Sequence, residues 1–198
     1  MGGSRKKRSH GFTVIELIIV ITVIGILASI VLAVYPGYQQ RARDTQRKND
    51  VQQIATALSA YAQQNDTNGY MEVASGCGFL GNGSGWTGAS GGWFSNSIIS
   101  CLVSAKVLSG GTFTDPSGCL SDSGGACGSN PAQAYMKMTC KKGGSNVTYV
   151  MAHLETQPRK DSEVDGLCDV GGATDDGFDT NGQKWGTNYG MNYYVVAK

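Results

Sequence analysis

The hydrophobic positions of the chain are unevenly distributed, and the first run of them is the clearest pattern. Between residues 12 and 34 every side chain is uncharged except Glu16, and most are large and apolar. Roughly 20 predominantly apolar residues are enough for a helix to cross a bilayer. The sequence therefore predicts a membrane-spanning helix that begins near Phe12.

A second pattern follows in residues 38–64. Apolar side chains recur there at spacings of three and four, at Val51, Ile54, Ala55, Leu58, Tyr61 and Ala62. This spacing places them on one face of a helix, with glutamines on the opposite face. Polar and glycine residues in 65–69 provide the stop signal. Together, residues 12–64 predict one nearly continuous helix of about 80 Å.

The rest of the chain is rich in glycine and predicts shorter elements. Residues 76–93 are predicted to form a surface loop, and a short amphipathic helix follows, with Asn96 as its cap and Gly110 near its end. Asp115 lies in a Thr-Asp-Pro turn, where we expect a surface carboxylate. The strand candidates are residues 133–140, 146–154 and 191–197, in an antiparallel meander.

Glu16 is the only ionisable side chain in the first apolar run. A carboxylate inside a bilayer is expensive unless it finds a partner, so an intramembrane acid is by default a functional residue. If the chain is cut between Gly11 and Phe12, the new amine of Phe12 lies about one helical turn from Glu16. A neighbouring copy of the chain could offer the same amine. Glu16 is therefore predicted to act in assembly.

The residues around Glu16 carry a resemblance to a known family. Gly11-Phe12-Thr13-Val14-Ile15-Glu16-Leu17, preceded by Arg5-Lys6-Lys7-Arg8, resembles the class III signal of type IV pilins and pseudopilins. The resemblance implies that a prepilin peptidase cuts between Gly11 and Phe12 and methylates Phe12. It also implies that Glu16 neutralises the N-terminus of an adjacent subunit. The chain departs from the family at Ala33, where the usual proline is absent, and has Pro36 instead.

Two simpler interpretations of the apolar run fit less well. An ordinary secretory signal has a shorter apolar core and a small-residue cleavage site after it, and no acid is expected within it. A plain membrane anchor fits the length but explains neither Glu16 nor the position of Gly11.

The resemblance implies an α+β fold, in which the long helix packs on a small antiparallel sheet. We expect a cleaved leader in residues 1–11, a transmembrane and filament-core helix in 12–35, an amphipathic half of that helix in 36–64 and a globular head in 65–198. The implied function is that of a structural subunit of a pilus-like filament serving adhesion, motility or DNA uptake. A secretion or competence pseudopilin is the alternative within the family.

The same resemblance implies partners and a location. The partners would be other copies of the chain, the prepilin peptidase, an assembly ATPase with its platform protein, and minor pilins. The precursor would sit in the bacterial cytoplasmic membrane, and the assembled filament would be extracellular. Lys and Arg are equally frequent on both sides of the apolar run, so the positive-inside rule does not orient it. The cysteines favour a head outside the cytoplasm.

Six cysteines in a loop-rich region predict disulfides, and their spacing matches no zinc motif. They are Cys77, Cys101, Cys119, Cys127, Cys140 and Cys168. Proximity in sequence favours the pairs 119 with 127, 77 with 101, and 140 with 168, among 15 connectivities.

A cofactor is not expected, although calcium is a candidate at an acidic stretch. Calcium takes oxygen ligands from flexible loops, which this stretch could supply. Its acids are Asp169, Asp175, Asp176 and Asp179.

Composition argues against catalysis and against a dedicated nucleic-acid binder. Without the leader, acidic residues outnumber Lys and Arg by three, so the chain has no net basic footprint. Only His10 and His153 are present, and His10 lies in the leader. His153 is predicted to be structural. The alternative of another class is a membrane-anchored extracellular binding module that uses a loop with Trp86 and Trp93.

Overall fold

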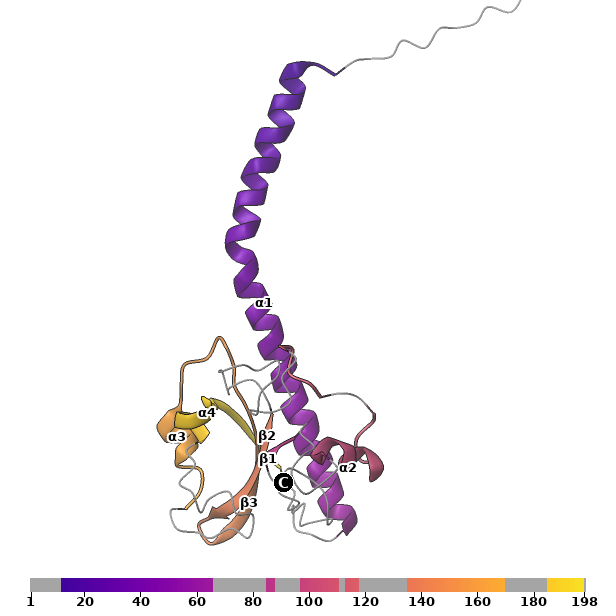
Figure 1. Cartoon of the computed structure of the whole chain (residues 1–198), viewed down its shortest axis with the longest axis vertical. Coiled ribbons are helices and arrows are strands. Elements are labelled where there is room, and N and C mark those ends of the chain that lie inside the picture. The colour runs from indigo at the N-terminus through magenta and orange to yellow at the C-terminus, as the bar shows by residue number, and fades with distance from the viewer. Residues whose placement is uncertain are drawn as a thin grey trace, which may run out of the picture. The chain divides into compact units, whose positions relative to one another are not determined.

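A long helix, α1 (Val14–Asn65), dominates the N-terminal part of the chain (Figure 1). The computed structural model describes residues 12–65, 85–87, 97–110, 113–117, 135–169 and 185–197. The helix is 52 residues long and continues through Pro36. The predicted continuous helix is therefore confirmed, with its start two residues later than expected.

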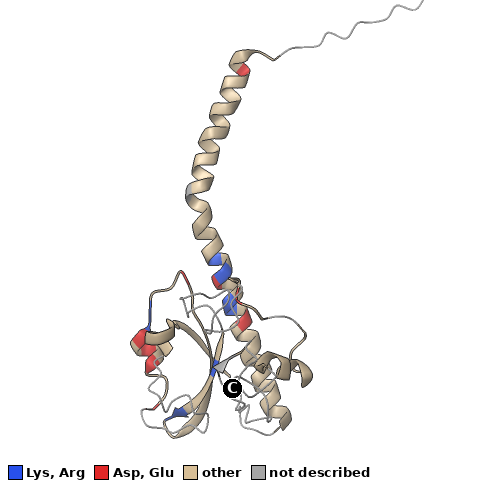
Figure 2. Ribbon diagram, in the orientation of Figure 1, with Lys and Arg blue, Asp and Glu red and all other residues tan. Residues whose placement is uncertain are grey.

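The described residues fall into two units that divide between Gln40 and Arg41. In the first unit, α1 is long and apolar enough to cross a membrane, and none of its apolar stretch is buried within the chain. Phe12 is 86% exposed and Tyr38 is 64% exposed. Figure 2 shows no charged residue on α1 between Glu16 and Arg41. Such a surface needs lipid or protein to cover it.

The second unit contains an antiparallel sheet in the order β1-β2-β3-β4. Its strands are β1 (Gly85–Trp86), β2 (Met136–Lys142), β3 (Ser145–Ala152) and β4 (Tyr193–Ala197). A two-residue turn joins β2 to β3, and Gly143 and Gly144 have φ angles of 59° and 80° there. Positive φ at both central positions is the geometry of a type I′ hairpin, which favours glycine. The predicted meander is confirmed.

Two local predictions were wrong. Gly85 and Trp86 form a strand within the predicted loop, because the preformed edge of β2 supplies their partners, with Gly85 opposite Lys137. The short helix α2 (Ile98–Ser104) is capped by Ser97 rather than Asn96. The Ser97 hydroxyl accepts the Ser100 N–H at 3.1 Å, which satisfies a free donor of the first turn.

The sheet is covered on both faces. On one face, Val51, Ile54 and Leu58 of α1 pack with α2 and with Val150 of β3. This confirms the predicted apolar stripe. On the other face, helices α3 (Asp161–Asp165) and α4 (Trp185–Tyr189) help to enclose a methionine-rich core that includes Met151. Figure 1 shows α2 and α3 on opposite sides of the sheet.

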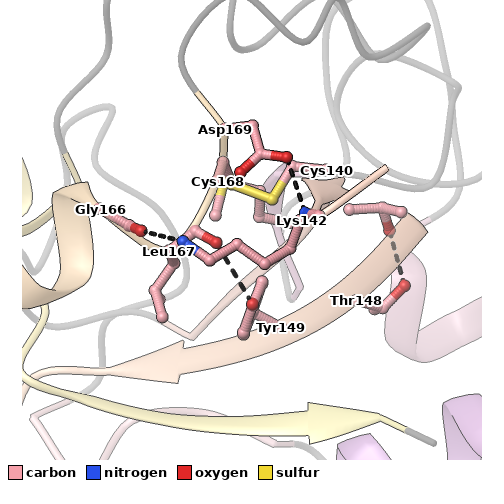
Figure 3. Close-up of a disulfide and its surroundings, with 11 residues drawn as sticks. Cys140, Lys142, Thr148, Tyr149, Gly166, Leu167, Cys168 and Asp169 are labelled. Carbon is pink, nitrogen blue, oxygen red and sulfur yellow. Dashed lines mark hydrogen bonds between the residues drawn. A yellow bond between two sulfur atoms is a disulfide. The ribbon is translucent and has the colours of Figure 1, made fainter. Parts of the chain in front are cut away.

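A disulfide between Cys140 and Cys168 attaches β2 to the segment that follows α3 (Figure 3). Asp169 reinforces the attachment: its N–H donates to the Lys141 carbonyl at 2.8 Å, and its Oδ2 accepts the Gly143 N–H at 2.7 Å. This predicted pair is confirmed. Cys101 is also disulfide-bonded. Its predicted partner, Cys77, and both members of the pair 119 with 127 lie outside the described residues.

Candidate functional site

The first turn of α1 contains the acid that the sequence singles out. Glu16 Oε2 accepts hydrogen bonds from the Thr13 N–H at 2.8 Å and from the Thr13 hydroxyl at 2.7 Å. In return, Thr13 Oγ1 accepts the Glu16 N–H at 3.3 Å. This reciprocal pair is a capping box, in which the residue before the helix and the third helical residue satisfy each other's free donors.

The capping box explains how an acid can be tolerated in this position within a single chain. Two donors on Thr13 satisfy one carboxylate oxygen, and the other has no hydrogen-bond partner among the described residues. Sequence analysis missed Thr13, although a threonine three residues before a glutamate is the sequence signature of the motif. Gly11 lies outside the described residues, and Phe12 is exposed beside the box.

A second polar cluster lies where α1 enters the second unit, and Arg47 is at its centre. The side chain of Arg47 is fully buried, with 0% exposure. Its Nε and Nη2 donate to the two carboxylate oxygens of Asp115 at 2.6 and 3.0 Å. Its Nη1 donates to Asp44 at 3.1 Å and to Glu155 at 2.7 Å. One guanidinium thus joins α1, the 113–117 turn and the segment after β3.

The carboxylates of this cluster have further donors. Asp44 accepts the N–H groups of Glu155 and Thr156, both at 2.8 Å, and the Thr156 hydroxyl at 2.6 Å. Glu155 also accepts from Arg43 Nε at 2.7 Å. No described buried side-chain nitrogen or oxygen lacks a hydrogen-bond partner. A fully satisfied polar cluster of this kind fixes one arrangement of the segments that it joins.

These contacts shift the pKa values of the acids. Burial alone would raise the pKa of Asp44, but the hydrogen bonds from Thr156, Glu155 and Arg47 outweigh it and hold the pKa below its ordinary value. The hydrogen bond from Arg43, with help from Arg47, also lowers the pKa of Glu155. Both carboxylates are therefore ionised at neutral pH.

Asp50 behaves in the opposite way, one turn further along α1. Its Oδ2 accepts a hydrogen bond from the Tyr135 hydroxyl at 2.6 Å. Burial is the largest influence on Asp50 and raises its pKa above the ordinary value. This hydrogen bond ties α1 to the start of β2, and it is not an ion pair like those that Arg47 makes.

The structure corrects the prediction for Asp115. Instead of lying at the surface, its side chain is buried, because the bidentate contact with Arg47 compensates for its removal from water. The Ser117 N–H and hydroxyl donate to the same carboxylate at 2.8 and 2.6 Å. The Asp-Pro turn is therefore a fixed part of the core.

The remaining candidates make structural contacts or lie outside the described residues. His153 Nδ1 is 2.6 Å from the Gly190 carbonyl oxygen, in line with the predicted structural role. Among the calcium candidates only Asp169 is described, and it bonds the Gly143 N–H. In the described part of the chain, no group of three or more His, Cys, Asp or Glu residues could hold a metal.

The fold and these sites define a class of chain that combines an N-terminal helix of membrane-spanning length, with an acid in its first turn, and an α+β unit. The family model described as the prokaryotic N-terminal methylation motif matches residues 6–32. The chain is 35% identical over 72 residues to the type IV major pilin protein PilA of Myxococcus xanthus, covering 36% of this chain and 32% of that protein. The motif and these relatives show that the chain is similar to type IV pilins and pseudopilins.

Two further relatives come from different systems. The chain is 33% identical over 78 residues to the type II secretion system core protein G of Aeromonas hydrophila, covering 39% of this chain and 53% of the relative. It is 43% identical over 54 residues to a fimbrial protein of Pseudomonas aeruginosa, covering 27% and 35%. The chain thus spans from about a third to about half of the length of these relatives. No solved structure gives a significant match.

Proposed function

We propose that the chain is a structural subunit of a type IV pilus-like filament and polymerises through its N-terminal helix. One observation carries the proposal. Glu16, hydrogen-bonded to Thr13, lies in the first turn of a helix whose apolar side chains are exposed over a membrane-spanning length. A monomer in water could not leave this much apolar surface uncovered. Lipid covers it before assembly in our proposal, and neighbouring subunits cover it afterwards.

The proposed assembly step exchanges one partner of Glu16 for another. In the precursor, Thr13 satisfies the carboxylate through the capping box. We propose that a prepilin peptidase cuts between Gly11 and Phe12, which creates an amine, and methylates that amine. In the filament, Glu16 would pair with the Phe12 amine of an adjacent subunit. A charge pair inside an apolar core is much stronger than the same pair in water, so it favours one register of the helices.

The proposed partners are the prepilin peptidase, an assembly ATPase with its platform protein, and minor pilins. The precursor would span the cytoplasmic membrane with the second unit outside, where its disulfides are stable. A pseudopilin of type II secretion is the second candidate, and similarity to two core proteins G supports it. We propose no catalytic role. A membrane-anchored binding module that forms no filament would explain the helix but not Glu16.

The proposal can be tested on fibres sheared from cells that express the chain with its own assembly system. Negative-stain microscopy should show thin fibres, and mass spectrometry should find a subunit that begins at a methylated Phe12. Gly11→Asp should leave uncut precursor in the membrane and no fibres. Gly25→Asp is unsuitable as a control, because it adds a charge to the membrane segment; Gly110→Asp, at an open surface position, is the matched control. A mature N-terminus elsewhere would contradict the proposal.

A further inference from the structure

The part of α1 in the first unit has apolar side chains on every side of the helix. The consecutive residues 17–21 are all large, apolar and exposed, and they point in all directions around the helix axis. A helix that is apolar all round belongs in the core of a large protein or in a membrane. A single protein partner would cover one face and leave the others in water. A lipid bilayer surrounds such a helix completely.

The polar side chains inside this apolar run hydrogen-bond to their own helix. Thr22 Oγ1 donates to the Ile19 carbonyl at 2.8 Å, and Ser29 Oγ donates to the Ile26 carbonyl at 2.7 Å. Neither hydroxyl therefore needs a partner from outside, as hydrocarbon requires, because no water can satisfy it there. Figure 2 shows no charge along this stretch of α1. Residues 17–34 are thus suited to hydrocarbon throughout.

Side-chain polar atoms that still need a partner lie at the two ends of this run. At one end, Glu16 Oε2 accepts from Thr13, and Oε1 has no hydrogen-bond partner among the described residues. At the other end, Tyr35 and Tyr38 are exposed, and neither phenol hydroxyl bonds to a residue that the structure describes. Tyrosine is enriched where a bilayer meets water, because its ring is apolar and its hydroxyl is polar.

The separation of these two ends matches the thickness of a bilayer. At a rise of 1.5 Å per residue, the helix from Glu16 to Tyr35 spans about 28 Å. The hydrocarbon core of a typical bilayer is about 30 Å thick. A tilt of roughly 20°, which is usual for such helices, shortens the span only slightly. Glu16 and Tyr35 can therefore reach the two headgroup layers of one bilayer at the same time.

We propose that phospholipid headgroups hold α1 at a fixed depth in the precursor, with Glu16 in the cytoplasmic headgroup layer and Tyr35 and Tyr38 in the opposite one. The inference rests on the proposed function, in which lipid covers the helix before assembly, and it adds where the helix lies in the bilayer. Glu16 is then at the membrane surface in the monomer. Its carboxylate meets hydrocarbon only when the subunit moves outward, so it opposes release until a neighbouring subunit supplies a partner.

Carbodiimide labelling of the full precursor in vesicles tests the depth of Glu16. In dioleoyl phosphatidylcholine, a water-soluble carbodiimide should modify Glu16, as measured by mass spectrometry of its peptide on protein that resists carbonate extraction. The matched control combines Glu16→Gln with Ile24→Glu, which moves the acid about 12 Å toward the bilayer centre. Its carboxyl should be modified at least about tenfold less.

Two results of this comparison would overturn the proposal. One is equal modification of Glu16 and of the carboxyl that Ile24→Glu introduces. The other is a Glu16 yield that changes with the ratio of protein to lipid, because another copy of the chain, and not lipid, would then cover the helix.

Thicker vesicles test whether the tyrosines fix the depth. In dierucoyl phosphatidylcholine, the two ends cannot both reach headgroups, so tyrosines held at one surface draw Glu16 below the other. Modification of Glu16 should fall at least about threefold. Tyr35→Leu with Tyr38→Leu should restore it, because the helix is then free to shift, whereas tryptophan at both positions should behave like tyrosine.

An unchanged yield in the thicker bilayer, or no recovery in the leucine variant, would overturn the proposal. These measurements use the monomer alone. A failure to form fibres in cells would therefore count against the proposed function and not against the depth of the helix.

Discussion

Replacing Arg47 with methionine should destabilise the second unit more than any other single change in the polar cluster. Methionine keeps much of the aliphatic volume but removes the cation that Asp115, Asp44 and Glu155 share. Removing one partner from a buried ion pair costs about 3–5 kcal/mol, because the other partner stays buried without its counter-charge.

The contacts that remain place the expected loss toward the lower end of this range. Asp44 keeps three donors from Glu155 and Thr156, and Asp115 keeps two from Ser117. A loss of about 3 kcal/mol would still remove a large part of the roughly 5–15 kcal/mol that stabilises a typical domain. Arg47→Lys should fall between wild type and Arg47→Met, since lysine keeps the charge but not the bidentate geometry.

Urea unfolding of the full chain in mild detergent, followed by near-ultraviolet circular dichroism, measures the free energy of unfolding. Arg43→Met is the matched control, because the Arg43 side chain is 33% exposed and contacts only Glu155 within the cluster. Combining Arg47→Met with Asp115→Asn should destabilise the protein by less than the sum of the two single losses, with a coupling of about 0.5–3 kcal/mol. Equal losses for Arg47→Met and Arg43→Met, or strict additivity in the double variant, would refute this reasoning.

Three further predictions follow from other sites. The pKa values of Asp44 and Glu155 lie below their ordinary values of 3.8 and 4.5. Their contribution to stability is therefore present above about pH 4.5 and is lost as the pH falls through the lowered pKa values. Urea midpoints measured from pH 7 to pH 3 should decline below about pH 4.5, and a flat profile would contradict this expectation. Glu16→Leu should insert and be processed normally but fail to form fibres, whereas the exposed Glu163→Leu should assemble. Immunoblots of the sheared and membrane fractions measure both outcomes, and normal fibres made only of Glu16→Leu subunits would exclude the registry role. The folded, unreduced protein should show no reactive thiol at Cys140 or Cys168, and a double Cys→Ser change at these positions should lower the unfolding free energy by about 2–5 kcal/mol.

The sequence predicts α1, its apolar stripe and the β2 to β4 meander because each depends on a local pattern. The stripe at Val51, Ile54 and Leu58 repeats at helical spacing, and the hairpin between β2 and β3 has the two glycines that its turn requires. The bond between Cys140 and Cys168 followed from proximity in sequence, which happened to match the packing of β2 against the segment after α3.

The cluster around Arg47 was missed because the prediction assigned apolar residues to the core and charged residues to the surface, whereas Asp44, Arg47 and Asp115 are charged and buried. Asp44 and Arg47 continue the buried stripe backward from Val51 at the same three and four spacing, but charged residues are normally assigned to the solvent face. Their partners, Asp115 and Glu155, are 68 and 108 residues away from Arg47 in sequence. Only tertiary structure brings them together, so no local signal marks Asp115 as buried.

The two-sided cover of the sheet has a consequence for how this protein can change over time. From Met136 to Cys140 in β2 and from Thr148 to Ala152 in β3 every residue is buried, so most substitutions there disturb a core and are removed by selection. New surface chemistry arises more easily at exposed positions such as Lys142 and Ser145, beside the β2–β3 turn, whose side chains belong to neither core. Substitutions at such positions change the outside of the second unit while its two cores stay unchanged.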